Sequence, residues 1–101
     1  MSHRNGYAVV VTFAVTPEHR AAFRSAVLEN AAASLREEPG CSVFDVCEGA
    51  DGSEVFLYEI YDDEAAFKAH LTTEHFRCFD ATVGPWVREK RVQTYHRLTQ
   101  D

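Results

Sequence analysis

One glutamate and two histidines in the middle of the chain are candidates for proton transfer, because of their residue types and their spacing. Glu59 lies within an aromatic and apolar run at 56–61, and His70 and His75 follow an acidic turn. Histidine titrates close to neutral pH, and burial raises the pKa of a carboxyl group toward the same range. We therefore predict that Glu59, His70 and His75 are catalytic and remove a proton from a phenol or an enol. An ion-paired Glu59 and structurally bonded histidines are the competing interpretation.

A second group of residues could hold a substrate near these proton carriers. At 100° per residue, Asn30 and Ser34 fall on the same stripe of the first predicted helix as Phe23 and Val27, so both polar side chains face inward. Buried polar groups need partners, which a ligand oxygen or each other could supply. Trp86 could stack on an aromatic ligand or anchor a subunit interface. Phe44 and Phe76 are candidate apolar contacts for substrate, although such residues more often pack in a core.

The sequence predicts neither a metal site nor a large cofactor. His70 and His75 do not have the HExxH spacing, and no compact set of Asp, Glu or Cys near them completes a metal site. The chain also lacks a GxGxxG turn, a P-loop, a GxSxG elbow and a haem-attachment motif. An enzyme of this kind would have to rely on the reactivity of its substrate.

Hydrophobic periodicity predicts one α+β domain over residues 1–101. Strands are expected at Tyr7–Val15, Cys41–Glu48, 53–61 and 90–98, and helices at 17–37 and 64–71, with a short further helix through Phe79 that ends at Gly84. Thr16 should cap the first helix with its side chain. This βαββαβ order, with a broken second helix, is the ferredoxin-like motif. Cys41 and Cys47, an even number of residues apart, should share one face of their strand.

Both faces of the first predicted strand are apolar, and this pattern predicts a partner. Val9, Val11 and Phe13 alternate with Ala8 and Val10. Helices can cover only one face of such a sheet, so the other face needs a second cover. The simplest cover is a second copy of the chain, and we expect a two-fold homodimer with sheets packed face to face.

Composition narrows the possible partners and the compartment. A formal net charge of -6 argues against binding to nucleic-acid phosphates. No apolar run is long enough to cross a bilayer, and the first residues do not resemble a signal peptide. The three cysteines, without CxxC spacing, fit reduced thiols. We expect a cytoplasmic protein that binds neither membrane nor nucleic acid.

Five stretches of the chain together resemble the antibiotic biosynthesis monooxygenase (ABM) domain family. They are Glu29-Asn30, Glu38-Pro39-Gly40-Cys41, Phe44-Asp45-Val46, the strand at 56–62 and the histidine segment at 66–76. The resemblance implies a dimeric α+β barrel with a pocket between sheet and helices in each subunit. It also implies a cofactor-independent monooxygenase that acts on a quinol, a phenol or an enolisable aromatic, whose anion reacts directly with O2.

Two other functions remain open within or beside this family. The stretches around Phe44, Glu59 and His70 are also similar to the isomerase branch that degrades phosphorylated autoinducer-2. The basic stretch with Arg88, Lys90 and Arg91 resembles that branch as well and could suit a phosphorylated hydroxyketone. The haem-degrading branch does not fit, because its tryptophan would fall at His70 and its haem-binding histidine near Asp80. A dimer that binds a small molecule without turnover is the third hypothesis, since a fold does not fix a function.

Overall fold

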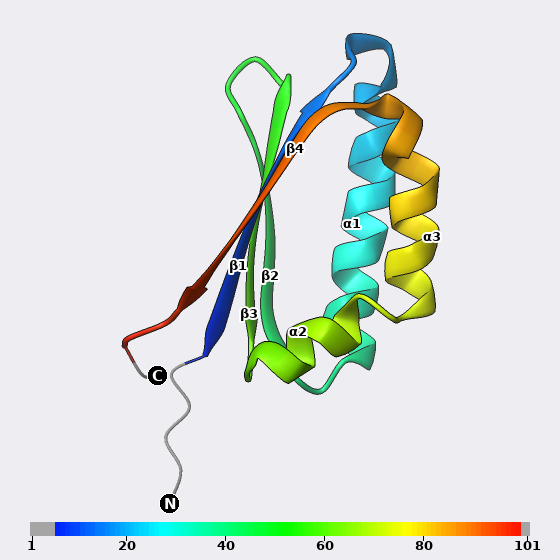
Figure 1. The fold of residues 1–101 in the computed structure, drawn as a ribbon. Helices are drawn as coiled ribbons and strands as arrows, with labels where there is room; N and C mark the ends of the chain where they lie inside the picture. Colours follow the sequence, from blue (N-terminus) through cyan, green and yellow to red (C-terminus); the bar gives the residue numbers. More distant parts are fainter. Residues whose placement is uncertain (1–5, 100–101) are drawn as a thin grey trace, which may run out of the picture.

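The computed structural model describes residues 6–99, and within them the predicted order of strands and helices is confirmed (Figure 1). The strands are β1 (Tyr7–Val15), β2 (Cys41–Glu48), β3 (Glu54–Tyr61) and β4 (Val87–His96), and the helices are α1 (Arg20–Glu37), α2 (Glu64–His70) and α3 (Glu74–Val83). Over these residues no helix has the length and apolarity to span a bilayer. The start of the chain, where no signal peptide is predicted, lies outside the described residues.

The break between α2 and α3 follows from local capping. Asp63 accepts a hydrogen bond from the Ala66 backbone N–H at 2.8 Å and so begins α2, and Thr73 accepts one from the Phe76 N–H at 3.2 Å and begins α3. A short polar side chain that caps a new helix also ends the old one. The break places His70 at the end of α2 and His75 in the first turn of α3.

Two expectations about element ends are wrong. The Thr16 side chain does not cap the first helix: its hydroxyl is bonded to the His19 ring at 2.8 Å and donates to the Trp86 carbonyl at 3.3 Å, and a 3-10 turn (Pro17–His19) precedes α1. The last strand begins at Val87 rather than Lys90, because it follows directly from the 3-10 turn Gly84–Trp86.

The sheet has the order β2-β3-β1-β4 with antiparallel neighbours, and α1 and α3 lie side by side against one of its faces (Figure 1). Alternate residues of β1 point toward these helices and form the core with the inner side of α1: Val9, Val11, Phe13, Val15, Phe23 and Val27. Glu59 pairs with Val9 across the β1–β3 ladder, so it lies on the covered face. The register therefore carries a carboxylate into the core.

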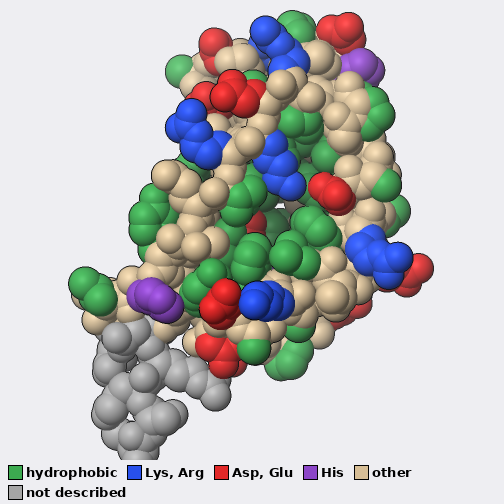
Figure 2. Space-filling model, viewed as in Figure 1, with side chains coloured by type: hydrophobic (Ala, Val, Ile, Leu, Met, Phe, Trp, Pro, Cys, Tyr) green, Lys and Arg blue, Asp and Glu red, His purple; other side chains and the backbone are tan. Residues whose placement is uncertain are grey.

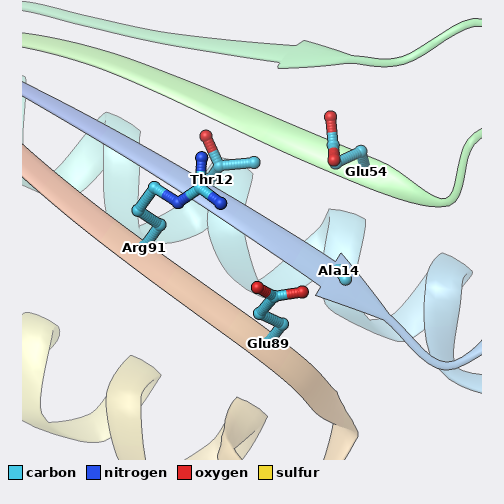
Figure 3. A pocket seen from close by; sticks show the side chains of 5 residues that line it. All are labelled: Thr12, Ala14, Glu54, Glu89 and Arg91. Atoms are coloured by element: carbon cyan, nitrogen blue, oxygen red, sulfur yellow. The ribbon is translucent and has the colours of Figure 1, made fainter.

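The opposite face of the sheet has no helix over it within residues 6–99 and exposes large apolar groups. Phe56 is 39% exposed and Tyr95 49% exposed. Figure 3 shows a shallow hollow on this face, lined by Thr12, Ala14, Glu54, Glu89 and Arg91. Each of its charged residues is exposed, so the hollow has the character of an open surface.

A register shift in β2 overturns one prediction about faces. Cys41 pairs with Tyr61, but the register shifts between Cys41 and Val43, and Phe44 then pairs with Glu59. Cys41 and Phe44 are both buried as a result, whereas Cys47, opposite Phe56, is exposed. The two cysteines lie on different faces because an extra residue in one strand reverses its alternation.

Candidate active site

A cavity lies between the helix-covered face of the sheet and the α2–α3 segment. It measures about 390 Å³ with its open mouth included. Aromatic side chains form most of its wall, and its polar residues are few: the lining includes Phe13, Phe44, Phe67, Phe76, Phe79, Asn30, Glu59, His70 and Lys90. Figure 2 shows the hollow between β4 and α3, with hydrophobic side chains around it and a basic side chain at its rim. Such a composition is typical of a site for a small, largely apolar molecule.

Glu59 is the acidic group of this cavity, and its surroundings set its protonation. Its side chain is 2% exposed and accepts a hydrogen bond from the Tyr61 hydroxyl at 2.6 Å. Burial raises the pKa of Glu59 to about 7, against the lowering effect of the Tyr61 hydrogen bond. The pKa of Tyr61 is raised above its ordinary value by burial and by Glu59, so the phenol remains a donor. Glu59 can therefore exchange a proton near neutral pH.

His70 lines the cavity and is fixed from behind by Glu38. The His70 Nδ1 atom lies 2.8 Å from Glu38 Oε2, and only Nε2 remains available to a molecule in the cavity. Burial lowers the pKa of His70 more than Glu38 raises it, which favours a neutral ring. We assign the ring proton to Nδ1 from its contact with the carboxylate, and Nε2 is then a hydrogen-bond acceptor.

His75 contacts the same carboxylate oxygen of Glu38. Its Nε2 atom lies 2.5 Å from Glu38 Oε2, and its Nδ1 atom lies 3.9 Å from Glu37 Oε1. Glu38 thus links His70 at the end of α2 to His75 in α3. His75 itself lies outside the cavity, in a cleft that it lines with Glu38, Thr73 and Cys78.

Asn30 carries the polar group in the cavity that most needs a ligand. The residue is 3% exposed, and its Oδ1 atom has no hydrogen-bond partner within residues 6–99. A buried amide oxygen without a partner is costly unless a bound molecule or water satisfies it. Lys90 lines the cavity from β4, where its ammonium group lies 5.6 Å from the centre of the Phe13 ring and 3.6 Å from Asp80.

The structure brings most of the predicted site residues together at the cavity and places three of them, His75, Ser34 and Trp86, outside its lining. Phe44 and Phe76 line the cavity with Glu59, His70 and Asn30. Ser34 is fully buried, and its hydroxyl donates to the Asn30 backbone carbonyl at 2.9 Å, so it supports the helix that carries Asn30. Trp86 stacks on His19 with ring centres 5.4 Å apart, away from the cavity lining.

Glu38 and Tyr61 are the residues of the site that sequence reasoning missed. Glu38 precedes Pro39 and Gly40, a pattern that indicates only the end of a helix. The sequence around His70 and His75 offers no third metal ligand, but Glu38 supplies one from 32 residues before His70. Tyr61 could have been predicted from the sequence, because it lies two residues after Glu59 on the same strand and residues at that spacing share a face.

Comparison with known proteins identifies the family. The family model for antibiotic biosynthesis monooxygenase matches residues 6–82, which is most of the chain. The chain belongs to the antibiotic biosynthesis monooxygenase family. The expected resemblance is confirmed by this match, and the matched range contains every residue of the cavity discussed above except Lys90 on β4.

Named ABM relatives share both sequence and fold with the chain. It is 36% identical over 77 residues to "Putative monooxygenase Rv0793" of Mycobacterium tuberculosis, which covers 76% of this chain and 75% of that protein. The solved structure of Rv0793 aligns with a TM-score of 0.86 at 30% identity over 94% of this chain and 97% of that one. A "Putative antibiotic biosynthesis monooxygenase from Nitrosomonas europaea" aligns with a TM-score of 0.89 at 30% identity, over 97% and 94%. The ferredoxin-like α+β fold is therefore shared with this family.

Proposed function

We propose that this ABM-family protein is a cofactor-independent monooxygenase that acts on a small quinol or phenol through the substrate anion. The observation that carries the proposal is a buried carboxyl group, Glu59, whose pKa is about 7, on the wall of an aromatic cavity. A general base is most effective when its pKa lies near the working pH, because a large fraction of it is then ionised and it still binds a proton strongly enough to remove one from the substrate. Aromatic walls suit a planar ring.

The chemistry begins with transfer of the substrate hydroxyl proton to the Glu59 carboxylate. The second hydroxyl donates its one hydrogen bond to Asn30 Oδ1 or to His70 Nε2, which orients the ring within the cavity. The anion transfers two electrons to O2 and forms a carbon–oxygen bond at a ring carbon that bears hydrogen, and the peroxide takes the proton back from Glu59. The resulting hydroperoxide loses water, so one oxygen atom becomes a carbonyl of the product and the other leaves as water.

The dimensions and charges of the cavity favour a single-ring substrate. The space open to water-sized groups measures about 50 Å³, against about 390 Å³ with the open mouth included, so the cavity has room for no more than a small ring. The polar side chains of Glu59, His70 and Asn30 line the cavity wall, and Lys90 adds a positive charge from β4. A ring with two hydroxyl groups and a short apolar substituent matches this distribution.

The proposal is tested by oxygen uptake with a panel of substituted hydroquinones and isotopically labelled O2. We expect one labelled atom in the quinone product and one in water, and at least a hundredfold loss of turnover in Glu59→Gln. Glu54→Gln is the matched control, because it removes an exposed carboxylate from the same strand. Ligand-induced thermal stabilisation without oxygen uptake would instead identify a binding protein.

Isomerisation of a phosphorylated hydroxyketone is the second candidate, and Lys90 is the observation in its favour. A cation at the cavity could bind a phosphate, and Glu59 could form the enediolate. The basic cluster at 88–91 is divided between the two faces of the sheet, however, because Arg91 lies in the hollow of the helix-free face (Figure 3). Hydrogen–deuterium exchange at the substrate carbon without oxygen uptake would favour the isomerase.

We also propose that the helix-free face forms a homodimer interface. Phe56, Val10 and Tyr58 form an apolar strip across β1 and β3, in which Phe56 is 39% exposed. An exposed apolar strip of this kind on a sheet is typical of a protein–protein interface. Light scattering coupled to size-exclusion chromatography that gives the monomer mass would refute this arrangement.

A further inference from the structure

We propose that Glu38, His70 and His75 form a site for one divalent transition-metal ion of the Zn²⁺ type, at the junction of α1, α2 and α3. The ligand atoms are Glu38 Oε2, His70 Nδ1 and His75 Nε2, and they all lie within 4.8 Å of one another. Neither Glu38 nor His75 lines the aromatic cavity, so the ion would sit behind His70. The site shares His70 with the aromatic cavity, but its ability to bind a metal does not depend on the proposed oxygenation chemistry.

The donor set selects the class of metal. Two imidazole nitrogens and one carboxylate oxygen are the ligands that Zn²⁺ and Co²⁺ bind well, whereas Mg²⁺ and Ca²⁺ prefer oxygen ligands alone. Metal–ligand bonds of about 2.0–2.2 Å would hold these donors about 3–3.5 Å apart. The observed separations, 2.8 Å and 2.5 Å from the carboxylate oxygen to the two rings, require only small side-chain rotations to reach that geometry.

The surroundings of His75 support its role as a ligand. A metal-binding histidine usually places its other ring nitrogen near a carboxylate, which fixes the tautomer. In His75 the outer nitrogen, Nδ1, lies 3.9 Å from Glu37 Oε1, while Nε2 faces Glu38. Glu37 is thus in position to orient the ring for coordination through Nε2.

The site also has a route from solvent. His75 and Glu38 line an open cleft together with Glu37, Thr73, Glu74 and Cys78. Its three carboxylates attract cations, and its opening leaves a fourth coordination position for water. The His75 side chain is 15% exposed and that of Glu38 11%, so an ion could enter without unfolding the helices.

Metal binding would change what the cavity presents to its ligand. Coordination at His70 Nδ1 moves the neutral ring's proton to Nε2, the atom available to the cavity. The acceptor at that position becomes an N–H donor. The proposed metal site could therefore alter ligand preference while holding the three helices together.

The alternative is a metal-free cluster in which the Glu38 carboxylate accepts an N–H from each ring. Calorimetry and visible absorption on the full chain, stripped with a chelator and titrated with Zn²⁺ or Co²⁺, separate the two. We expect one equivalent to bind, the Co²⁺ complex to show the visible bands of low-coordinate nitrogen and oxygen ligation, and Mg²⁺ to give no response. Failure of Zn²⁺ and Co²⁺ to bind would overturn the site.

Variants assign the ligands independently of turnover. His75→Gln and Glu38→Gln should each weaken Co²⁺ binding at least tenfold and change the visible bands, and Glu37→Gln should weaken it less. His96→Gln, at an exposed histidine of β4, is the matched control and should bind like the unaltered protein. Circular dichroism confirms that each variant folds. Unchanged bands and affinity in both His75→Gln and Glu38→Gln would contradict the assignment, whatever the enzyme activity proves to be.

Discussion

Replacement of Glu59 by Gln should make the protein more stable at alkaline pH, because the carboxylate form of Glu59 is poorly solvated. Its pKa is about 7 in the fold against an ordinary value of 4.5, with burial as the main cause. At about 1.4 kcal/mol for each pH unit, this difference corresponds to about 3 kcal/mol. The folded state binds the proton more tightly than the unfolded chain, so the stabilisation is complete below pH 4.5 and is lost as pH rises through about 7.

The assay is urea unfolding of the unaltered protein and the Gln variant between pH 5 and pH 8. About 2.5 kcal/mol of the loss falls in this interval for the unaltered protein, and the variant should lack it. Gln keeps an oxygen that can accept the Tyr61 hydroxyl, so the hydrogen bond of 2.6 Å has a substitute. Glu54→Gln, at an exposed position of the same strand, should retain the full pH dependence. Parallel stability curves for the Glu59 variant and the unaltered protein would refute the argument that burial raises this pKa.

Three further substitutions test the cavity, the helix junction and the interface. Asn30→Leu should weaken binding of a hydroquinone about tenfold without lowering the free energy of unfolding, because it removes a buried oxygen that has no partner in residues 6–99; unchanged affinity by calorimetry would exclude Asn30 from the site. Gly40→Ala should cost about 1–3 kcal/mol in urea unfolding, because a Cβ there would lie 2.8 Å from the Cβ of Ala66, whereas Gly84→Ala, with open space around it, should cost less than 1 kcal/mol. Phe56→Glu should give a monomer by light scattering with unchanged circular dichroism, and a dimer that persists in this variant would place the interface elsewhere.

The parts of the fold that the sequence predicted are those that local rules determine. Alternation located β1 and β3, and the apolar stripe of α1 placed Asn30 and Ser34 on its buried face. The break between α2 and α3 was likewise visible, because capping residues act within a few positions of themselves.

The parts that could not be predicted depend on contacts between distant residues. Glu38 is an ordinary helix-ending residue in the sequence, and it contacts the two histidines only because α1 ends beside the α2–α3 break. The extra residue at the start of β2 places Phe44 on the same buried face as Cys41. Simple alternation would have placed Phe44 and Cys41 on opposite faces. Ser34 and Trp86 were predicted to contact a ligand, but each contacts a neighbouring residue of the protein. The Ser34 hydroxyl donates to the Asn30 carbonyl, and the Trp86 ring stacks on His19.

The proposed role of Glu59 as the base that ionises the substrate is tested most directly by the pH dependence of kcat/KM for oxygen uptake with a hydroquinone. For the unaltered protein we predict a rise with pH to a plateau, with its midpoint near the Glu59 pKa of about 7. In Glu59→Gln the rate should fall at least a hundredfold and this rise should disappear. A variant that keeps the same midpoint, or that turns over at an undiminished rate, would contradict the role of Glu59 as the base.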